Sequence, residues 1–148
     1  MSTPTAIESV TAALLAARRD QRPADATPLT EALTHAEDAY AVQARVAAAL
    51  EGADAPFPRH WKSGGPSRSA VLTHAPLPAA GVWASPAAAA GFHFNLRLIE
   101  AEIALRLGEA VTPAMAERLL PDTAGALVAA MAVSIEVVDS RWQQGTAA

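Results

Sequence analysis

The sequence predicts a mixed α+β fold, in which helices come first and strands are mixed with helices afterwards. Two early segments repeat apolar residues at helical spacing, and after Phe92 the apolar residues alternate with a period of two. A short β-branched run, Val133–Val138, predicts a further strand. The 148 residues suit a single domain, which we divide into an N-terminal helical region, 1–55, and a β-rich region, 56–148.

Two helices are predicted in the N-terminal region. The first covers Thr5–Arg19, where apolar residues recur three and four positions apart, and Pro23 ends the segment. The second follows Thr34 and Glu37, which match a capping box, in which a hydroxyl and a carboxylate satisfy free backbone N–H groups reciprocally. We expect this helix to end at Gly52, because glycine is the residue type that most often follows a helix.

Two loops and a long strand are predicted next. Residues 53–69 and 76–86 are rich in proline, glycine, serine and alanine, and both are expected to be loop-like. The apolar positions of the following strand divide between its two faces: Phe92, Phe94, Leu96 and Leu98 on one, and Ile99, Ala101, Ile103, Leu105 and Leu107 on the other. One inserted residue reverses side-chain alternation, so this switch predicts a β-bulge or a bend directly before Glu100.

The last third of the chain predicts two short helices and a strand. Thr112 and Pro113 form a strong helix start, with a hydroxyl N-cap followed by proline, and this helix is expected to reach about Leu119. A second helix is predicted over Asp122–Ala130, followed by the strand Val133–Val138.

Composition excludes several classes of function. The formal net charge is −4 and only 18% of residues are charged, whereas nucleic-acid binding requires a concentrated basic surface. The chain has no cysteine, which excludes disulfides and thiolate metal sites, and its four histidines show no ligand spacing. No signal sequence and no apolar run of about 18 residues is present, so we expect a cytoplasmic protein that binds neither nucleic acid nor membrane.

Two glutamates interrupt the apolar strand and suggest a cation site. On a strand, Glu100 and Glu102 point to the same side with Cβ atoms about 7 Å apart, so both carboxylates can reach one cation. Hard oxygen ligands select Mg²⁺, Mn²⁺ or Ca²⁺. The alternative is that both side chains simply face water on an edge strand.

Glu136 is the candidate third carboxylate. It lies among apolar, β-branched neighbours, where a carboxylate is costly to bury unless a cation, a basic partner or protonation compensates for it. Arg141 is the structural alternative, as partner in an ordinary ion pair. Asp139 is the competing third ligand, although it lies on the opposite strand face from Glu136 unless the strand has already ended.

Lys62 is the only lysine in the chain and lies in the stretch HWKSGG. Burial tunes the pKa of a lysine readily, which suits an acid/base group or an anchor for a substrate carboxylate. The alternative is an ordinary lysine on a surface loop.

Four blocks of the chain occur in the order seen in one enzyme family: AYAVQARV (39–46), WKSGGPS (61–67), IEAEIALRLG (99–108) and IEVVDSR (135–141). With them, the chain from about Ala13 to Trp142 resembles the 2-keto-4-pentenoate hydratase and 4-oxalocrotonate decarboxylase group of the fumarylacetoacetate hydrolase superfamily. The resemblance implies the N-terminal portion of a mixed β-roll, so 56–148 would be a partial catalytic region.

The resemblance also implies a site and an activity. It implies that Glu100, Glu102 and Glu136 hold Mg²⁺ or Mn²⁺, and that Lys62 lies at the active site. It implies a cytoplasmic homo-oligomer that takes part in aromatic catabolism. The implied activity is that of a hydratase acting on a short 2-oxo acid or its enol, such as 2-hydroxypenta-2,4-dienoate. Decarboxylation of a 2-oxo acid and hydrolysis of an acylpyruvate are alternatives that use the same metal site.

The chain departs from the family at several positions. Ser63 replaces the usual valine, Gly65 and Pro66 replace alanine and threonine, and Leu77 stands after Pro76 where the family has an acid. Family members also continue well past the last block, so we expect a truncated form or a fragment. A catalytically silent homologue that serves as a binding or partner subunit is therefore a further alternative.

Overall fold

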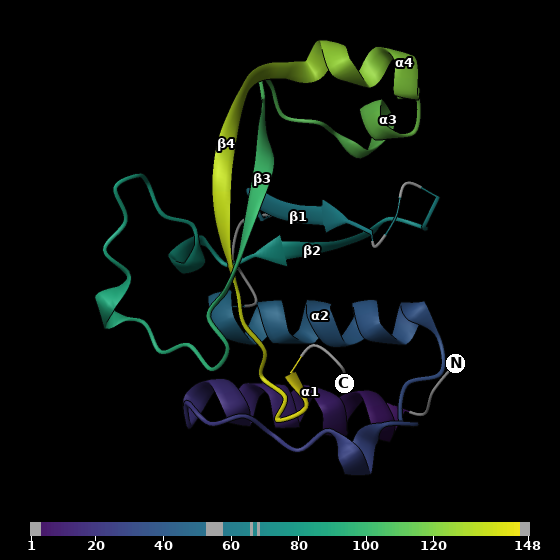
Figure 1. The fold of residues 1–148 in the computed structure, drawn as a ribbon. Helices are drawn as coiled ribbons and strands as arrows, with labels where there is room; N and C mark the ends of the chain where they lie inside the picture. Colours follow the sequence, from purple (N-terminus) through teal and green to yellow (C-terminus); the bar gives the residue numbers. More distant parts are fainter. Residues whose placement is uncertain (1–3, 53–57, 66, 68, 146–148) are drawn as a thin grey trace. The chain divides into compact units, whose positions relative to one another are not determined.

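The computed structural model (Figure 1) describes residues 4–52, 58–65, 67 and 69–145. These residues divide into two compact units. The first unit comprises the chain as far as Asn95 together with the C-terminal residues from Ser140, and the second is Leu96–Asp139. Helices and two small antiparallel sheets make up the chain, which confirms the predicted mixed α+β class. The predicted boundary between residues 55 and 56 lies outside the described residues.

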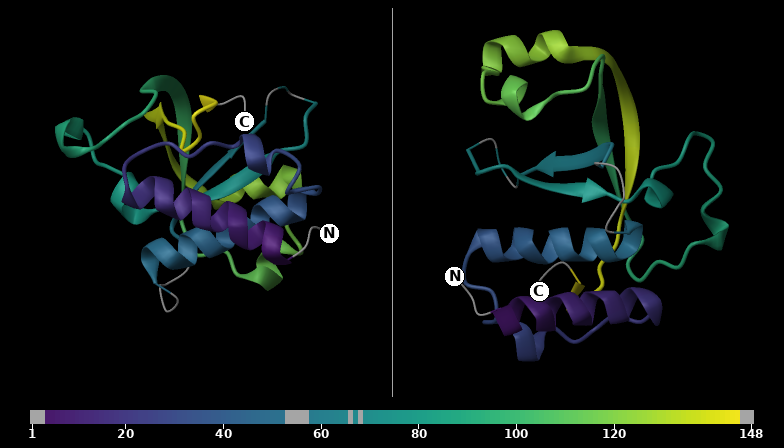
Figure 2. Two further views of the ribbon diagram at one scale, coloured as in Figure 1. Left: turned by 90° about the horizontal axis from the view of Figure 1, so that it is seen from below. Right: turned by 180° about the vertical axis from the view of Figure 1, so that it is seen from behind.

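Two helices of equal length form the core of the first unit. Helix α1 (Pro4–Arg19) and helix α2 (Ala36–Glu51) lie side by side, as Figure 2 shows from two further directions. Val10, Val42 and Val46 are buried between them because apolar residues at helical spacing form one stripe on each helix. An ion pair between Glu8 and Arg45, with 3.7 Å between carboxylate and guanidinium, also joins the two helices.

The two ends of α2 confirm one prediction and correct another. The predicted capping box of Thr34 and Glu37 is wrong by one residue, because the carboxylate of Asp38 accepts the backbone N–H of His35 at 3.2 Å. Gly52 ends the helix as predicted, and its N–H donates to the carbonyl of Ala48 at 2.9 Å. Its φ of 91° and ψ of 149° place it in a region that almost only glycine occupies.

A hairpin follows where the sequence predicted a loop. Strand β1 (His60–Gly64) pairs antiparallel with strand β2 (Thr73–Leu77), and Lys62 lies opposite Ala75. The loop predictions are therefore wrong for residues 60–64, which form β1, and for residues 76–77, which end β2, because each short strand is held by its partner. Residues 78–86 are mostly irregular, as expected, with one 3₁₀ turn, Ala79–Gly81.

The C-terminal segment is bound to the start of the chain within the first unit. Ala24 pairs with Trp142 in a parallel bridge, in which the Ala24 N–H donates to the carbonyl of Arg141 and Gln143 N–H donates to the carbonyl of Ala24. Trp142 also packs against the valine core, and the amide of Gln144 donates to the carboxylate of Asp25 at 2.7 Å.

The second unit is built on a two-stranded antiparallel ribbon. Strand β3 (Leu98–Leu107) pairs with strand β4 (Val128–Val138) in continuous register from Leu98 opposite Val138 to Arg106 opposite Ala130. The bulge predicted between Leu98 and Ile99 is therefore wrong, since the only register shift in this ribbon falls between Arg106 and Leu107.

The apparent change of strand face has another cause. Residues 92–97 are not a strand, and their alternating aromatic residues instead gather around Trp83, with Phe92 at 4.2 Å and Phe94 at 6.5 Å between ring centroids. The chain then passes through Arg97 at a φ of 59° before β3 begins. The two alternating sets therefore belong to different kinds of structure and need no bulge between them.

Short helices connect the two strands at one end of the ribbon (Figure 1). Helix α3 (Pro113–Ala116) begins where predicted, with the Thr112 hydroxyl accepting the N–H of Met115, but it ends three residues before Leu119. Helix α4 (Pro121–Ala124) and a 3₁₀ turn, Gly125–Leu127, replace the predicted helix over 122–130, because β4 begins at Val128. None of the helices described here is both long and apolar enough to cross a membrane.

Candidate metal centre

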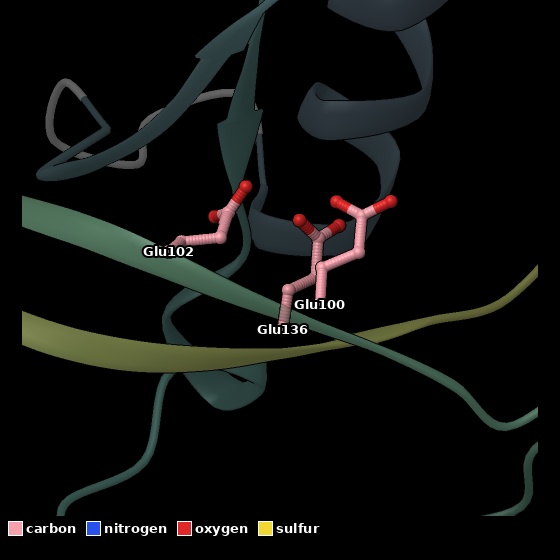
Figure 3. Close-up of side chains that lie close together, drawn as sticks. All are labelled: Glu100, Glu102 and Glu136. Carbon is pink, nitrogen blue, oxygen red and sulfur yellow. The ribbon is translucent and has the colours of Figure 1, made fainter.

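The three predicted glutamates meet on one face of the β3–β4 ribbon. Glu100 lies directly opposite Glu136 in the register, and directly opposed residues of an antiparallel pair project to the same face with Cβ atoms about 5 Å apart. Glu102 is two residues further along β3 and therefore projects to that face as well. We call the face that carries these three side chains the carboxylate face; Figure 3 shows all three on one side of the ribbon.

The carboxylates converge closely enough to share one ion. One oxygen from each glutamate can be chosen so that all three lie within 4.8 Å of one another. Around Mg²⁺, ligand oxygens at about 2.1 Å from the ion lie about 3 Å apart at neighbouring octahedral positions. A facial set around one ion would therefore require side-chain rotations that bring the three oxygens closer together. Glu100 is exposed, whereas Glu102 and Glu136 are half-buried.

The charge of the cluster favours a divalent cation. Two carboxylates about 4.8 Å apart repel each other by about 1 kcal/mol at the dielectric constant of water and about 3 kcal/mol at an effective value of 20. A cation placed among the three oxygens attracts all of them. Three carboxylates and no sulfur or imidazole ligand make a set that suits Mg²⁺, Mn²⁺ or Ca²⁺.

The competing third ligand lies elsewhere. Strand β4 ends at Val138, one residue before Asp139, and the carboxylate of Asp139 accepts the backbone N–H of Leu96 at 2.8 Å. This bond ties the entry to β3 to the exit from β4. Glu136 rather than Asp139 therefore completes the cluster, and within the described ranges no other group of three acidic or histidine side chains meets the same geometric condition.

Lys62 lies in the first unit, on β1, and is half-buried. Alternation along the hairpin places Trp61 and His74 on one face and Lys62 on the other. The His74 ring stacks on Tyr40 of α2 at 4.7 Å and contacts Trp61 at 5.9 Å, so this histidine packs in an aromatic cluster, as its lack of ligand spacing suggested.

Sequence reasoning missed Ser134 as a neighbour of the site. Ser134 lies directly opposite Glu102 on the carboxylate face and is half-buried. The signal was present, because residues 134 and 136 of a strand must share a face. Its hydroxyl can both donate and accept a hydrogen bond, which suits a second contact for water or an oxygen ligand beside the glutamates.

Comparisons of this chain with protein family profiles, with characterised proteins and with solved structures gave no match.

Proposed function

We propose that this chain binds Mg²⁺ or Mn²⁺ through Glu100, Glu102 and Glu136 and serves a metal-dependent hydratase reaction on a short 2-oxo acid or its enol. A compound such as 2-hydroxypenta-2,4-dienoate represents the substrate class. The observation that carries the proposal is the convergence of three carboxylates on one ribbon face. The order of the four sequence blocks adds the reaction class through their resemblance to the hydratase and decarboxylase family.

The three glutamates hold the cation and leave part of its coordination sphere to the substrate and water. They supply three oxygens, whereas Mg²⁺ takes six ligands in an octahedral arrangement. The bound cation would act as a Lewis acid that stabilises the negative charge developing on the 2-oxo oxygen during enolisation. Ser134, opposite Glu102, is well placed on this face to orient a water molecule or a ligand oxygen beside the cluster.

Lys62 is the proposed partner for proton transfer or for the substrate carboxylate. This role comes from the match of WKSGG to the family block and from the chemistry of the side chain, since an ammonium group can donate a proton and bind an anion. The half-buried position of Lys62 on β1 is consistent with such a role. A partial β-roll, a cytoplasmic location and a homo-oligomeric state belong to the same proposal.

The decisive experiment combines metal binding with product analysis. Mn²⁺ added to the protein should lose its free-ion electron paramagnetic resonance signal in proportion to the protein, and Glu102→Gln should abolish this effect. Glu117→Gln serves as the matched control because Glu117 is an exposed glutamate outside the cluster in the same unit. An undiminished free-ion signal with the wild-type protein would contradict the proposed site.

The products then distinguish the possible reactions. A hydroxydienoate substrate should give a 4-hydroxy-2-oxo acid if the protein is a hydratase. Release of carbon dioxide from an oxalocrotonate would instead indicate a decarboxylase, and pyruvate with a carboxylic acid from an acylpyruvate would indicate a hydrolase. Metal binding without turnover of any of the three substrates would identify a silent homologue that keeps the site.

A further inference from the structure

The second unit is inserted in the chain of the first. The chain leaves the first unit after Asn95 and returns to it at Ser140. Within the first unit, the side-chain amide of Asn95 donates to the carbonyl of Ser140 at 2.8 Å. Within the second unit, the Leu96 N–H donates to the carboxylate of Asp139 at 2.8 Å. Each unit is therefore closed by a hydrogen bond of its own at the point where the chain passes between them.

The first unit also has a core and a long-range closure of its own. Val10, Val42 and Val46 are buried together between α1 and α2. The C-terminal segment is bound to the start of the chain by the bridge between Ala24 and Trp142, and Trp142 packs against the valine core. Because all of these contacts lie within the first unit, they can persist while the second unit opens.

The second unit depends on a single strand pairing. Every residue of this unit is described, its only sheet is the pair β3–β4, and its helices α3 and α4 have four residues each. A two-stranded ribbon is by itself marginally stable in water. Parts of a protein that few packing contacts hold in place open locally, at a free energy well below that of global unfolding. We therefore expect the second unit to open more readily than the helical core of the first.

The proposed ligands of the cation lie on both strands of this unit. Strand β3 supplies Glu100 and Glu102, and strand β4 supplies Glu136. Like charges at directly opposed positions, such as Glu100 and Glu136, weaken the pairing of two strands. A divalent cation that binds all three carboxylates instead links the strands, and the link is lost when they separate. The cation therefore binds the closed form of the second unit in preference to the open form.

We propose that a divalent cation controls a local order–disorder transition of the second unit, Leu96–Asp139, while the first unit stays folded. At a cation concentration of about 100 times Kd, binding shifts the equilibrium toward the closed form by about 100-fold. The cation concentration thus sets the fraction of chains that carry an assembled carboxylate face, which makes the cation a regulator of the site. The inference rests on the metal site of the proposed function and is independent of the reaction proposed there.

Hydrogen exchange of backbone amides in the full chain, measured with Mg²⁺ and with a chelator, tests the proposal. With the chelator, the most protected amides of β3 and β4 should exchange at least tenfold faster than those of α1 and α2. Mg²⁺ at about 100 times Kd should slow the β3 and β4 amides about 100-fold. Equal protection of both sets of amides in the chelator overturns the proposal, because the chain then opens as one body.

Two variants show whether the response belongs to the cluster. Glu102→Gln, with a loss of about 100-fold in affinity, should show a slowing of only about twofold at the same Mg²⁺ concentration. The matched control Glu117→Gln should keep the wild-type response, since Glu117 lies outside the cluster in the same unit. A Glu102→Gln protein that responds as strongly as the wild type overturns the proposal.

Mn²⁺ binding, followed by electron paramagnetic resonance on the same samples, separates the two ways in which the result can fail. If Mn²⁺ binds and the β3 and β4 amides exchange at an unchanged rate, the transition is overturned and the metal site of the proposed function stands. If Mn²⁺ does not bind, the metal site fails and the transition fails with it.

A cross-link between the strands supplies a second test that leaves the glutamates intact. Ala104 and Ala132 lie directly opposite each other on the carboxylate face, and the chain has no cysteine, so Ala104→Cys together with Ala132→Cys allows one disulfide. The oxidised protein should respond to Mg²⁺ far less than the reduced protein, because its strands cannot separate. A response of wild-type size in both forms overturns the proposal.

Discussion

Removing one carboxylate from the cluster should abolish a metal-dependent gain in thermal stability. Glu102→Gln keeps the size of the side chain and removes its charge, and it leaves Glu100 and Glu136 as a cross-strand pair. A neutral amide oxygen is a weaker ligand for a hard cation than a carboxylate. Because Glu102 is half-buried on a regular strand, the substitution should leave the ribbon intact.

The size of the effect follows from ligand linkage. Removal of a residue that merely supports a metal ligand costs 10–100-fold in affinity, so loss of a ligand itself should cost about 100-fold or more. At a cation concentration of about 100 times Kd, the wild type gains about 2.7 kcal/mol, whereas a variant with 100-fold weaker binding gains about 0.4 kcal/mol. For a chain of this length that corresponds to a rise in Tm of about 8 °C against about 1 °C.

The assay is a thermal melt of each variant with Mg²⁺ or Mn²⁺ and with a chelator. Comparing the two conditions within one variant cancels any contact that Glu102 makes with the rest of the protein. Glu117→Gln should keep the wild-type rise, because its side chain lies on an exposed turn outside the cluster. A wild type that shows no rise, or a Glu102→Gln protein that keeps it, would refute the assignment of the cluster as the metal site.

Three further predictions concern the first unit. Val42→Ala should lower the free energy of unfolding by about 1–3 kcal/mol in a urea titration, because Val42 is 4% exposed in the helical core; an unchanged midpoint would contradict this packing. Gly52→Ala should lower the free energy of unfolding by about 1–3 kcal/mol, because a residue with a Cβ is strained at a φ of 91°. Gly81→Ala should lower it far less, because a Cβ there also meets no neighbouring atom but φ is not positive. Hydrogen bonds from the Thr27 hydroxyl and backbone N–H lower the pKa of Asp25, so its carboxylate stabilises the fold above the ordinary pKa of 3.8 and loses that effect as the pH falls further. Asp25→Asn should therefore flatten the dependence of the free energy of unfolding on pH, and only in that acid range. An equal slope in both proteins would refute this contribution.

The parts of the fold that follow from local pattern were predictable. Helix α1 begins within one residue of its predicted start, and the Thr112 cap and the Gly52 terminus lie where predicted. These features depend on side chains only a few positions apart, so the sequence contains all the information needed. The capping residue of α2 is the exception, where Asp38 takes the place expected for Glu37.

The parts that depend on distant pairing were not predictable. Strand β1 contains glycine and serine and is held by β2, and the alanine-rich start of β4 favours a helix until pairing with β3 overrides that preference. The same limit applies to the site. Alternation along the strand places Glu100 and Glu102 on one face. Only the pairing of β3 with β4 brings Glu136 opposite Glu100. Only the folded chain shows that Asp139 instead accepts a backbone N–H.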